Sequence, residues 1–374
     1  MERKKLLIVT GEVSGDLHGY NIAKELLNHQ NFEIHAVGGN KLRSLPIKII
    51  TDLTSYSTIG FTDFIPYLGK ILKARRKILD TVYENRYDAI LFIDNQGFNI
   101  PVARKCKKAG IKCYYYFPPI VSVWDRKNSK IIPGIFDLIL CPFKADAEIY
   151  LKNGGKAVFT GHAFIDTVKA NKQALEIKKQ LEIDKNKKVI GIFPGSRKKE
   201  IQNLLPDILQ ACTKLKENTS FILSCAYPSL SEWINNILLK YNLEVKITNG
   251  TDYDIINACD IIVGASGSLA IETALLEKPM VVLYKVSKIT YFLAKLLIKT
   301  KYISWPNIIL DRQVYPELIQ NKVNPENIYN KINGLLNGNT NTLNSGLKEF
   351  KSKLGNTGVI KKIAKIIIKE ISNE

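Results

Sequence analysis

The 374-residue sequence has no long hydrophobic run, and this absence argues against a membrane-spanning protein. Its uninterrupted apolar stretches stay below about ten residues, whereas a helix that crosses a bilayer needs about 20. The basic N-terminus is followed by a short apolar stretch, residues 6–9, which is too brief for the core of a secretory signal peptide. We therefore expect neither a transmembrane helix nor a signal peptide.

Metal-binding and nucleophile motifs are missing as well. The six cysteines are scattered without a C-x-x-C pair, and the four histidines form no H-E-x-x-H pattern. The chain also lacks a G-x-S-x-G elbow, a G-x-G-x-x-G fingerprint and a Walker loop. These absences predict reduced core thiols in a cytosolic protein and no bound metal, and they give little support to a serine hydrolase or a dinucleotide- or ATP-binding enzyme.

Positive charge is in excess, because 54 Lys and Arg stand against 35 Asp and Glu, a formal net charge of +19. Such a surface attracts polyanions, either nucleic acid or an anionic membrane, although general lysine richness explains the same number. No zinc finger, recognition helix or aromatic RNA-binding signature accompanies the charge. Nucleic acid is therefore the weaker of the two partner hypotheses.

The apolar and aromatic segment 60–69 (GFTDFIPYLG) runs directly into a basic cluster. This order is typical of an interfacial membrane contact, and the alternative is a loop that packs into the core ahead of a solvated helix face. The predicted membrane contact comprises Phe61, Phe64, Ile65, Tyr67, Leu68, Lys70, Lys73, Arg75, Arg76 and Lys77.

Short apolar runs alternate with helical patterns twice along the chain. The expected strands include residues 6–9, 32–37, 89–93, 112–116 and 138–140, and then 189–193, 221–223, 261–263 and 280–283. Nearly continuous apolar strands separated by helices indicate parallel sheets covered on both faces. We predict an α/β protein with two Rossmann-like domains facing a central cleft, residues 1–167 and 168–345. A charged link is expected over 168–188, a loop over 333–346, and a C-terminal helix over 346–374 that packs back on the first domain.

Two loops of the second half are suited to a nucleoside diphosphate. Gly195, Ser196 and Arg197 follow a strand and offer amides, a hydroxyl and a guanidinium to phosphate oxygens. Ser266, Gly267 and Ser268 follow a second strand, and Glu272 lies about one helical turn further, where a carboxylate can accept ribose hydroxyls. The alternatives are a surface role for the arginine and a helix-end role for the glutamate.

The first half has one polar loop and one acidic strand end. The loop after the first strand begins with Gly11, Glu12, Ser14, Gly15 and Asp16, and its glycines permit a tight turn and close backbone approach. Asp94 ends the strand over 89–93, where it is a candidate general base for a sugar hydroxyl. The alternatives are a capped strand-to-helix turn and an aspartate that caps the following helix.

Eight motifs in a fixed order carry a family resemblance. They are Gly11-Glu12-Val13-Ser14-Gly15-Asp16, Ile93-Asp94 with Gly97-Phe98-Asn99, Pro142-Phe143, Gly161-His162, Pro194-Gly195-Ser196-Arg197, Ala265-Ser266-Gly267-Ser268, Pro279-Met280-Val281-Val282 and Pro306-Asn307-Ile308. From residue 6 to about residue 320 the chain resembles the lipid-A-disaccharide synthases. That family consists of inverting, metal-independent glycosyltransferases of the B-type fold. They join UDP-2,3-diacylglucosamine to 2,3-diacylglucosamine 1-phosphate and release UDP and the β-1,6 disaccharide of lipid A.

The resemblance also implies roles and a location. It makes Asp94 the acceptor-side base, Arg197 a diphosphate ligand, Glu272 a ribose ligand and Asn307 part of the donor site. It implies no cofactor, a homodimer, and a cytoplasmic enzyme peripheral on the inner membrane. The chain departs from the family at Gln96, Gly97, Ser122 and Asp125 on the acceptor side. Two alternatives stay open: a related UDP-sugar transferase with another lipid acceptor, and a catalytically silent lipid or nucleotide-sugar binding protein.

Overall fold

The computed structural model describes residues 3–29, 31–54, 68–124, 126–250, 252–287, 291, 300–338 and 340–372. The chain forms two compact units. The first contains the residues up to Asp166 together with those from Leu354 onward, and the second contains Thr167–Lys353.

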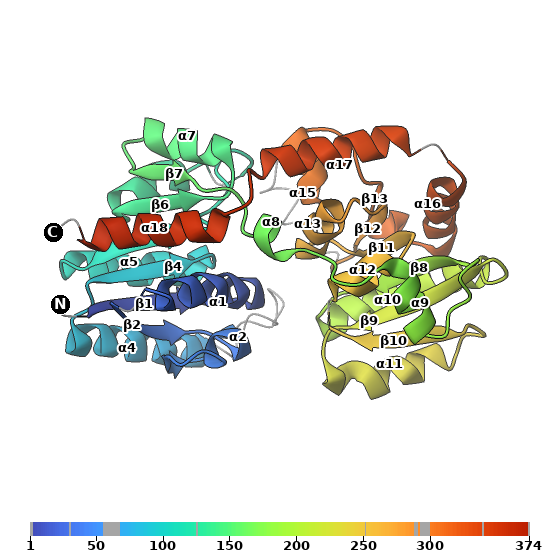
Figure 1. The fold of residues 1–374 in the computed structure, drawn as a ribbon, viewed down its shortest axis with the longest axis horizontal. Helices are drawn as coiled ribbons and strands as arrows, with labels where there is room; N and C mark the ends of the chain where they lie inside the picture. Colours follow the sequence, from blue (N-terminus) through green and yellow to red (C-terminus); the bar gives the residue numbers. More distant parts are fainter. Residues whose placement is uncertain are drawn as a thin grey trace. The chain divides into compact units, whose positions relative to one another are not determined.

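The first unit is built on a seven-stranded sheet in the order β3-β2-β1-β4-β5-β6-β7, and each pair of neighbours is parallel (Figure 1). Its strands are β1 (Lys4–Thr10), β2 (Phe32–Val37), β3 (Lys48–Thr51), β4 (Ala89–Ile93), β5 (Lys112–Tyr116), β6 (Leu138–Cys141) and β7 (Ala157–Phe159). The central strands β1 and β4 are almost wholly buried because helices cover both faces of the sheet. This burial explains their continuous apolar sequence.

Each face of the first sheet has its own apolar core. On one face pack α1 (Val13–Leu27), α2 (Asn40–Arg43) and the C-terminal helix α18 (Val359–Ser372). On the other pack α4 (Leu68–Asn85), α5 (Gln96–Lys108), η3 (Ile132–Gly134) and α7 (Lys144–Lys152). Helix α18 lies beside α1 (Figure 1), and the carboxylate of Asp166 accepts the amides of Gly358 and Ile360 at its start. The last helix thus belongs to the first unit.

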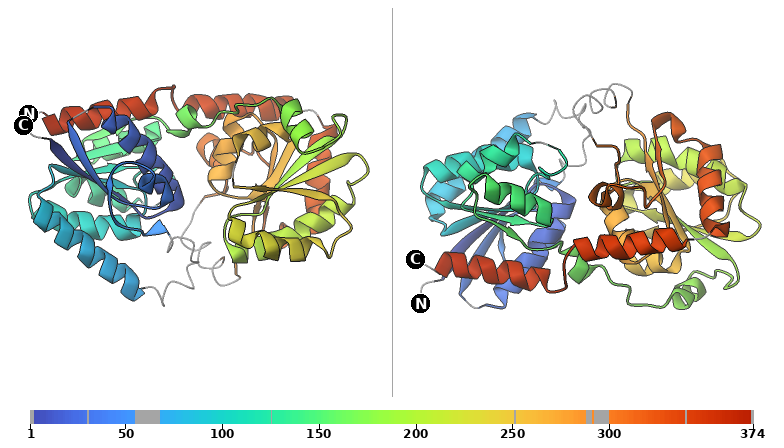
Figure 2. Two further views of the ribbon diagram at one scale, coloured as in Figure 1. Left: turned by 60° about the horizontal axis from the view of Figure 1, so that its bottom comes forward. Right: turned by 90° about the horizontal axis from the view of Figure 1, so that it is seen from above.

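The second unit repeats the plan with six parallel strands in the order β10-β9-β8-β11-β12-β13. They are β8 (Lys188–Phe193), β9 (Thr219–Cys225), β10 (Val245–Asn249), β11 (Ile261–Ala265), β12 (Met280–Tyr284) and β13 (Glu317–Ile319). Its helices are α9 (Ala174–Gln180), α10 (Lys198–Thr213), α11 (Ser231–Leu238), α12 (Tyr253–Ala258), α13 (Ser268–Leu275), α15 (Trp305–Leu310), α16 (Pro325–Asn337) and α17 (Asn341–Lys353). Figure 2 shows helices on both sides of the sheet in each unit.

The predicted fold class, two parallel-sheet α/β domains, is confirmed. The predicted loop over 333–346 is wrong, because most of it is helical in α16 and α17. Leu343 and Leu347 are buried there, and Gly346 lets α17 approach Val314 closely. Residues 346–353 accordingly continue α17 in the second unit. The expected link over 168–188 holds α9, which packs on α12.

All six cysteines are buried as free thiols. Within the described ranges, no helix is both long and apolar enough to cross a membrane. No cluster of three or more His, Cys, Asp or Glu side chains suited to a metal ion occurs in that part of the chain either.

Candidate active site

Both sheets place their predicted functional loops where the strand order changes direction. In the first sheet the loops after β1 and β4 are neighbours, and in the second the loops after β8 and β11 are. Open parallel sheets bind ligands at such switch points, beyond the carboxyl ends of the strands. We call residues 11–16 with 94–97 the β1/β4 site and residues 194–197 with 266–268 the β8/β11 site.

Close contact between two loops defines the β1/β4 site. A Cβ atom on Gly11 would overlap the side chain of Asn95, so a larger residue at this position requires Asn95 to move. Asp94 and Asn95 both have left-handed backbone angles, φ 51° and 42°. This conformation is uncommon outside glycine but is accessible to Asp and Asn. The strand thus ends in a sharp turn against the loop that follows β1.

Two side chains hold that turn. Nδ2 of the fully buried Asn99 donates to the backbone oxygens of Ile93 and Asp94, at 3.1 and 2.7 Å. The hydroxyl of Tyr115 donates to the same Asp94 oxygen at 3.0 Å. The N-cap of α5 is Asn95, whose side chain accepts the amide of Phe98. The capping role that was the alternative for Asp94 therefore falls to its neighbour.

The pKa of the Asp94 carboxyl lies near neutral pH. Burial and, second, the negative charge of Glu12 raise the pKa of Asp94 to about 7. The two carboxylates come from different loops, one after β1 and one after β4, and so meet only in the folded unit. A carboxyl with a pKa near 7 can alternate between accepting and holding a proton under physiological conditions.

The other residues of the loop after β1 differ in whether their polar groups are exposed to a ligand or are held by the protein. The carboxylate of buried Asp16 accepts the amides of Gly39 and Lys41, at 2.7 and 2.9 Å, and so fixes the start of α2. Gly15 is buried, and a Cβ atom there would make ordinary van der Waals contact with Thr10. Glu12 and Ser14 are partly exposed. They are the groups of this loop best placed to meet a ligand.

A cluster of aromatic rings packs around His18 in the first half of α1. His18 stacks on Phe117 and Phe164, with ring centroids 5.4 and 5.2 Å apart, and meets His162 edge-on at 5.8 Å. Burial lowers the pKa of His18 to about 4 and, with His18 itself, the pKa of His162 well below its usual value. Both imidazoles are neutral at pH 7, so they pack as aromatic rings.

In the β8/β11 site, a carboxylate that the sequence did not single out occupies part of the loop. Oε2 of Glu200 accepts the amide of Ser196 at 3.1 Å, and a Cβ atom on Gly195 would lie 2.0 Å from that oxygen. Gly195 has φ 108°, which also favours glycine. Glu200 is the third residue of α10, the position from which a glutamate reaches back in a capping box. The Ser196 amide is therefore already bonded, while the Arg197 side chain is exposed.

The second loop of the β8/β11 site contains Ser266, Gly267 and Ser268 ahead of α13. Ser266 Oγ donates to the Ile303 backbone oxygen at 3.1 Å, whereas Gly267 and Ser268 are exposed. Glu272 is 7 % exposed, and burial raises its pKa to about 7. Its charge also raises the pKa of Tyr253, so these two side chains are near each other. A carboxyl so poorly hydrated favours partners that donate hydrogen bonds.

Asn307 is fully buried, and its amide is saturated by protein groups. Its Nδ2 donates to the Tyr315 oxygen at 2.8 Å and to Oε1 of Glu317 at 2.7 Å, and its Oδ1 accepts the amides of Val314 and Tyr315. Glu317 also accepts the amide and hydroxyl of Ser304 at the N-cap of α15. A direct bond from Asn307 to a ligand requires one of these bonds to break, so its geometry suits positioning of the α15 loop.

The predicted membrane contact is described only in part. Phe61, Phe64, Ile65 and Tyr67 lie outside the described residues, as does the side chain of Leu68. In α4, Lys70, Lys73, Arg76 and Lys77 are exposed. Arg75 is half-buried, donates to the Gly97 oxygen at 2.8 Å and lies 5.3 Å from the Phe98 ring centre. It therefore holds the loop after Asp94.

Three of the four departures from the family pattern are described. Gln96 and Gly97 are exposed at the start of α5, and Gln96 Oε1 accepts from Asn128 at 3.1 Å. The amide of Ser122 donates at 2.8 Å to the buried Asp146, whose pKa burial raises to about 6. Asp125 lies outside the described residues.

Solved structures share this arrangement of two doubly wound sheets. An S. aureus MnaA–UDP structure aligns over 99% of this chain and 98% of its own, with a TM-score of 0.65 and 15% identity. Anabaena Alr3699/HepE in complex with UDP-glucose aligns over 98% and 99%, with a TM-score of 0.58 and 14% identity. The fold is that of the B-type glycosyltransferases and related UDP-sugar epimerases.

Residues 6–371 match the family model described as lipid-A-disaccharide synthetase. The lipid-A-disaccharide synthase of Geobacter metallireducens is 32% identical over 377 residues, which cover 99% of this chain and 98% of that protein. That of Geobacter sulfurreducens is 31% identical over 99% of this chain and 98% of its own. The chain belongs to the lipid-A-disaccharide synthetase family, and it is a glycosyltransferase of lipid A assembly.

Proposed function

We propose that the chain transfers a diacylglucosaminyl group from its UDP donor to diacylglucosamine 1-phosphate, forming the β-1,6 disaccharide 1-phosphate and UDP. The observation that carries the site assignment is the position of the motif loops at both topological switch points. Family membership over residues 6–371 supports the reaction itself.

The proposed mechanism is a single displacement with inversion. Asp94 accepts the proton of the acceptor 6-hydroxyl, whose oxygen forms a bond to the donor's anomeric carbon. The bond from that carbon to the diphosphate oxygen breaks, and its electron pair leaves with UDP. The raised pKa of Asp94, about 7, suits a base that must take up a proton near neutral pH.

We assign the donor to the β8/β11 site. The exposed Arg197 guanidinium balances the charge that develops on the departing diphosphate. The backbone amides of Gly267 and Ser268 and the Ser268 hydroxyl donate hydrogen bonds to the same oxygens. Buried Glu272 accepts the ribose hydroxyls, and their hydrogen bonds offset the cost of its desolvation. Gly195, Ser196, Ser266 and Asn307 shape the loops around these groups.

We place the enzyme on the cytoplasmic face of the inner membrane, where both acylated substrates reside, and propose a homodimer. Pulling an acylated sugar fully into water costs about 0.8 kcal/mol for each methylene exposed, so docking at the membrane lowers that cost. The exposed Lys70, Lys73, Arg76 and Lys77 support an electrostatic contact with anionic headgroups.

A second candidate is transfer to a different lipid acceptor. It is favoured by the departures at Gln96 and Gly97, which directly follow the Asp94 turn. Mass spectrometry of purified protein mixed with UDP-diacylglucosamine and a panel of acceptors tests both functions. Disaccharide 1-phosphate with the standard acceptor supports the first, and product with another acceptor alone supports the second. UDP binding without product from any acceptor leaves a silent binding protein.

A further inference from the structure

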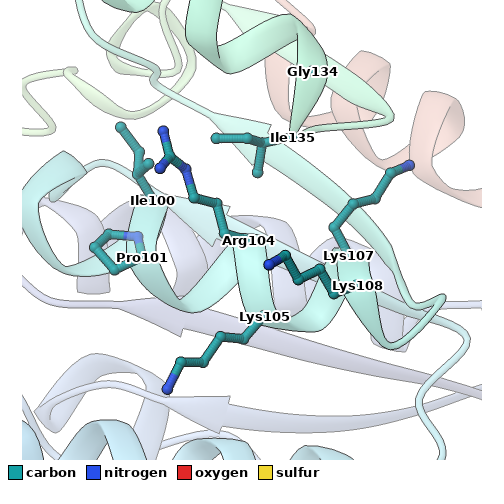
Figure 3. Close-up of a pocket in the computed structure, with 8 residues that line it drawn as sticks. All are labelled: Ile100, Pro101, Arg104, Lys105, Lys107, Lys108, Gly134 and Ile135. Atoms are coloured by element: carbon teal, nitrogen blue, oxygen red, sulfur yellow. The ribbon is translucent and has the colours of Figure 1, made fainter.

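A groove on the outer side of α5 is separate from both switch points. Its volume is about 620 Å³, and Figure 3 shows its lining. The lining residues are Ile100, Pro101, Arg104, Lys105, Lys107, Lys108, Gly134 and Ile135. None of them belongs to the β1/β4 or β8/β11 site.

The charge of the groove is strongly one-sided. Helix α5 carries four cations and no acidic residue over Gln96–Lys108. Among the described residues, Lys107 is the one cation of the four with an acidic partner, Asp137, whose other oxygen accepts the amide of Cys113 at 2.9 Å. Within the ranges that the structure describes, no acidic side chain forms an ion pair with Arg104, Lys105 or Lys108. Three cations are thus left for an external anion.

The base of the groove is apolar. Ile135 is buried and Ile100 half-buried, and the exposed Ile131 lies a few residues ahead of Gly134. In Figure 3 the Arg104 guanidinium lies between Ile100 and Ile135, and Lys105 points the other way. An anion attached to an apolar chain matches this lining better than free phosphate. RNA is less well matched, because the groove has no aromatic side chain on which a base can stack.

The same face of the first sheet carries further cations on α4. Helices α4 and α5 contact each other and cover the same face of the first sheet. Helix α4 adds the exposed Lys73, Arg76 and Lys77 to the cations of α5. A flat anionic surface can meet both helices at once, whereas a small soluble anion meets only one pocket.

We propose that this groove binds the phosphate of an anionic phospholipid when the protein docks on a membrane. Arg104 and Lys108 hold the phosphate, and Ile100 and Ile135 contact the glycerol and upper acyl region. The inference rests on the proposed membrane function and adds to it a headgroup site distinct from the acceptor and donor sites.

The test is sedimentation with phosphatidylcholine vesicles that contain or lack phosphatidylglycerol. We expect Arg104→Ala/Lys108→Ala to lower partitioning onto anionic vesicles by roughly tenfold at unchanged melting temperature. The matched control is Lys361→Ala/Lys365→Ala. It removes two exposed lysines of α18 from the opposite face of the same sheet and should bind like wild type.

Equal losses in the two variants would show diffuse charge attraction and overturn the proposal. Release of the wild type by inorganic phosphate alone would identify a free-phosphate site, and tight RNA binding lost in the α5 variant would identify a nucleic-acid site. Turnover of detergent-dispersed substrates should be unchanged in the α5 variant. A wild type that binds anionic vesicles but makes no disaccharide would refute the proposed reaction and leave the headgroup site standing.

Discussion

The two units share the strand order around their switch points, but the charged groups at these two points differ. At the β1/β4 site, burial and, second, the negative charge of Glu12 raise the pKa of Asp94 to about 7. At the β8/β11 site, Glu200 is bonded to the loop amide, and the exposed group is a cation, Arg197. The first arrangement suits proton transfer and the second suits an anionic leaving group.

This difference gives separate expectations for the two units. Changes at the β1/β4 site should lower kcat or move its pH dependence while leaving UDP affinity intact. Changes at the β8/β11 site should weaken UDP binding as well as turnover.

The largest effect is expected for Asp94→Asn. Asparagine keeps the shape and tolerates the left-handed backbone but cannot accept the proton, so the rate should fall by about 10² to 10⁴. Product formation by mass spectrometry measures this loss, and calorimetry should show unchanged UDP affinity. Asp80→Asn, at an exposed position of α4, is the matched control. Full activity of the folded Asp94 variant would remove the general-base role.

Arg197→Ala should lower turnover by at least about 10²-fold, because a charge-assisted contact to the diphosphate strengthens as the leaving group departs. Unlike the Asp94 variant, it should also weaken UDP binding. Lys198→Ala is the control, since that lysine lies over the Trp233 ring, 5.2 Å from its centre. Near-wild-type turnover of the arginine variant would remove Arg197 from the site, and the two units would then not differ in the charge that they offer a ligand.

The sequence predicted the elements whose burial is complete. Strands β1, β4, β8 and β11 are continuous apolar runs because both faces of each sheet are covered, and their ends therefore located the functional loops. The short edge strands β3, β7, β10 and β13 were not among the expected strands. They are only partly buried and give a weaker apolar signal.

Side-chain contacts between distant segments were harder to predict. The Asn307–Glu317 bond and the Arg75–Gly97 bond depend on tertiary packing, which neither prediction took into account. Asn307 was assigned to the donor site from the family resemblance, and Arg75 was assigned to the membrane contact from the local sequence. The role of Glu200 could have been predicted from the sequence, because a glutamate at the third position of a helix is a capping signal. The charge of Glu12 on Asp94 depends on the pairing of β1 with β4.

A smaller effect is expected at Glu200. Glu200→Ala leaves the Ser196 amide without its partner and should weaken UDP binding by roughly tenfold. Glu200→Gln keeps an acceptor and should restore most of the affinity, and exposed Glu217→Gln controls for the lost charge. Calorimetric titration with UDP measures all three. Tighter binding by both Glu200 variants would mean that this carboxylate competes with the diphosphate for the loop.

The smallest effect is expected for Glu12→Gln, and it is a shift in pH dependence. The general base must be ionised, so kcat/KM of the wild type should fall as the pH drops through about 7, the pKa of Asp94. Burial is the larger cause of that raised pKa and remains in the variant, but the repulsion from the Glu12 charge is removed. The pKa of Asp94 should therefore move down, and the acidic limb of the kcat/KM profile should move to lower pH, so the variant keeps more of its maximal rate in mildly acidic buffer. Glu25→Gln, at the opposite end of α1, should leave the profile in place. An unchanged limb in Glu12→Gln with intact folding would show that the two carboxylates do not interact in the enzyme, and the contrast between the two units would then rest on burial alone.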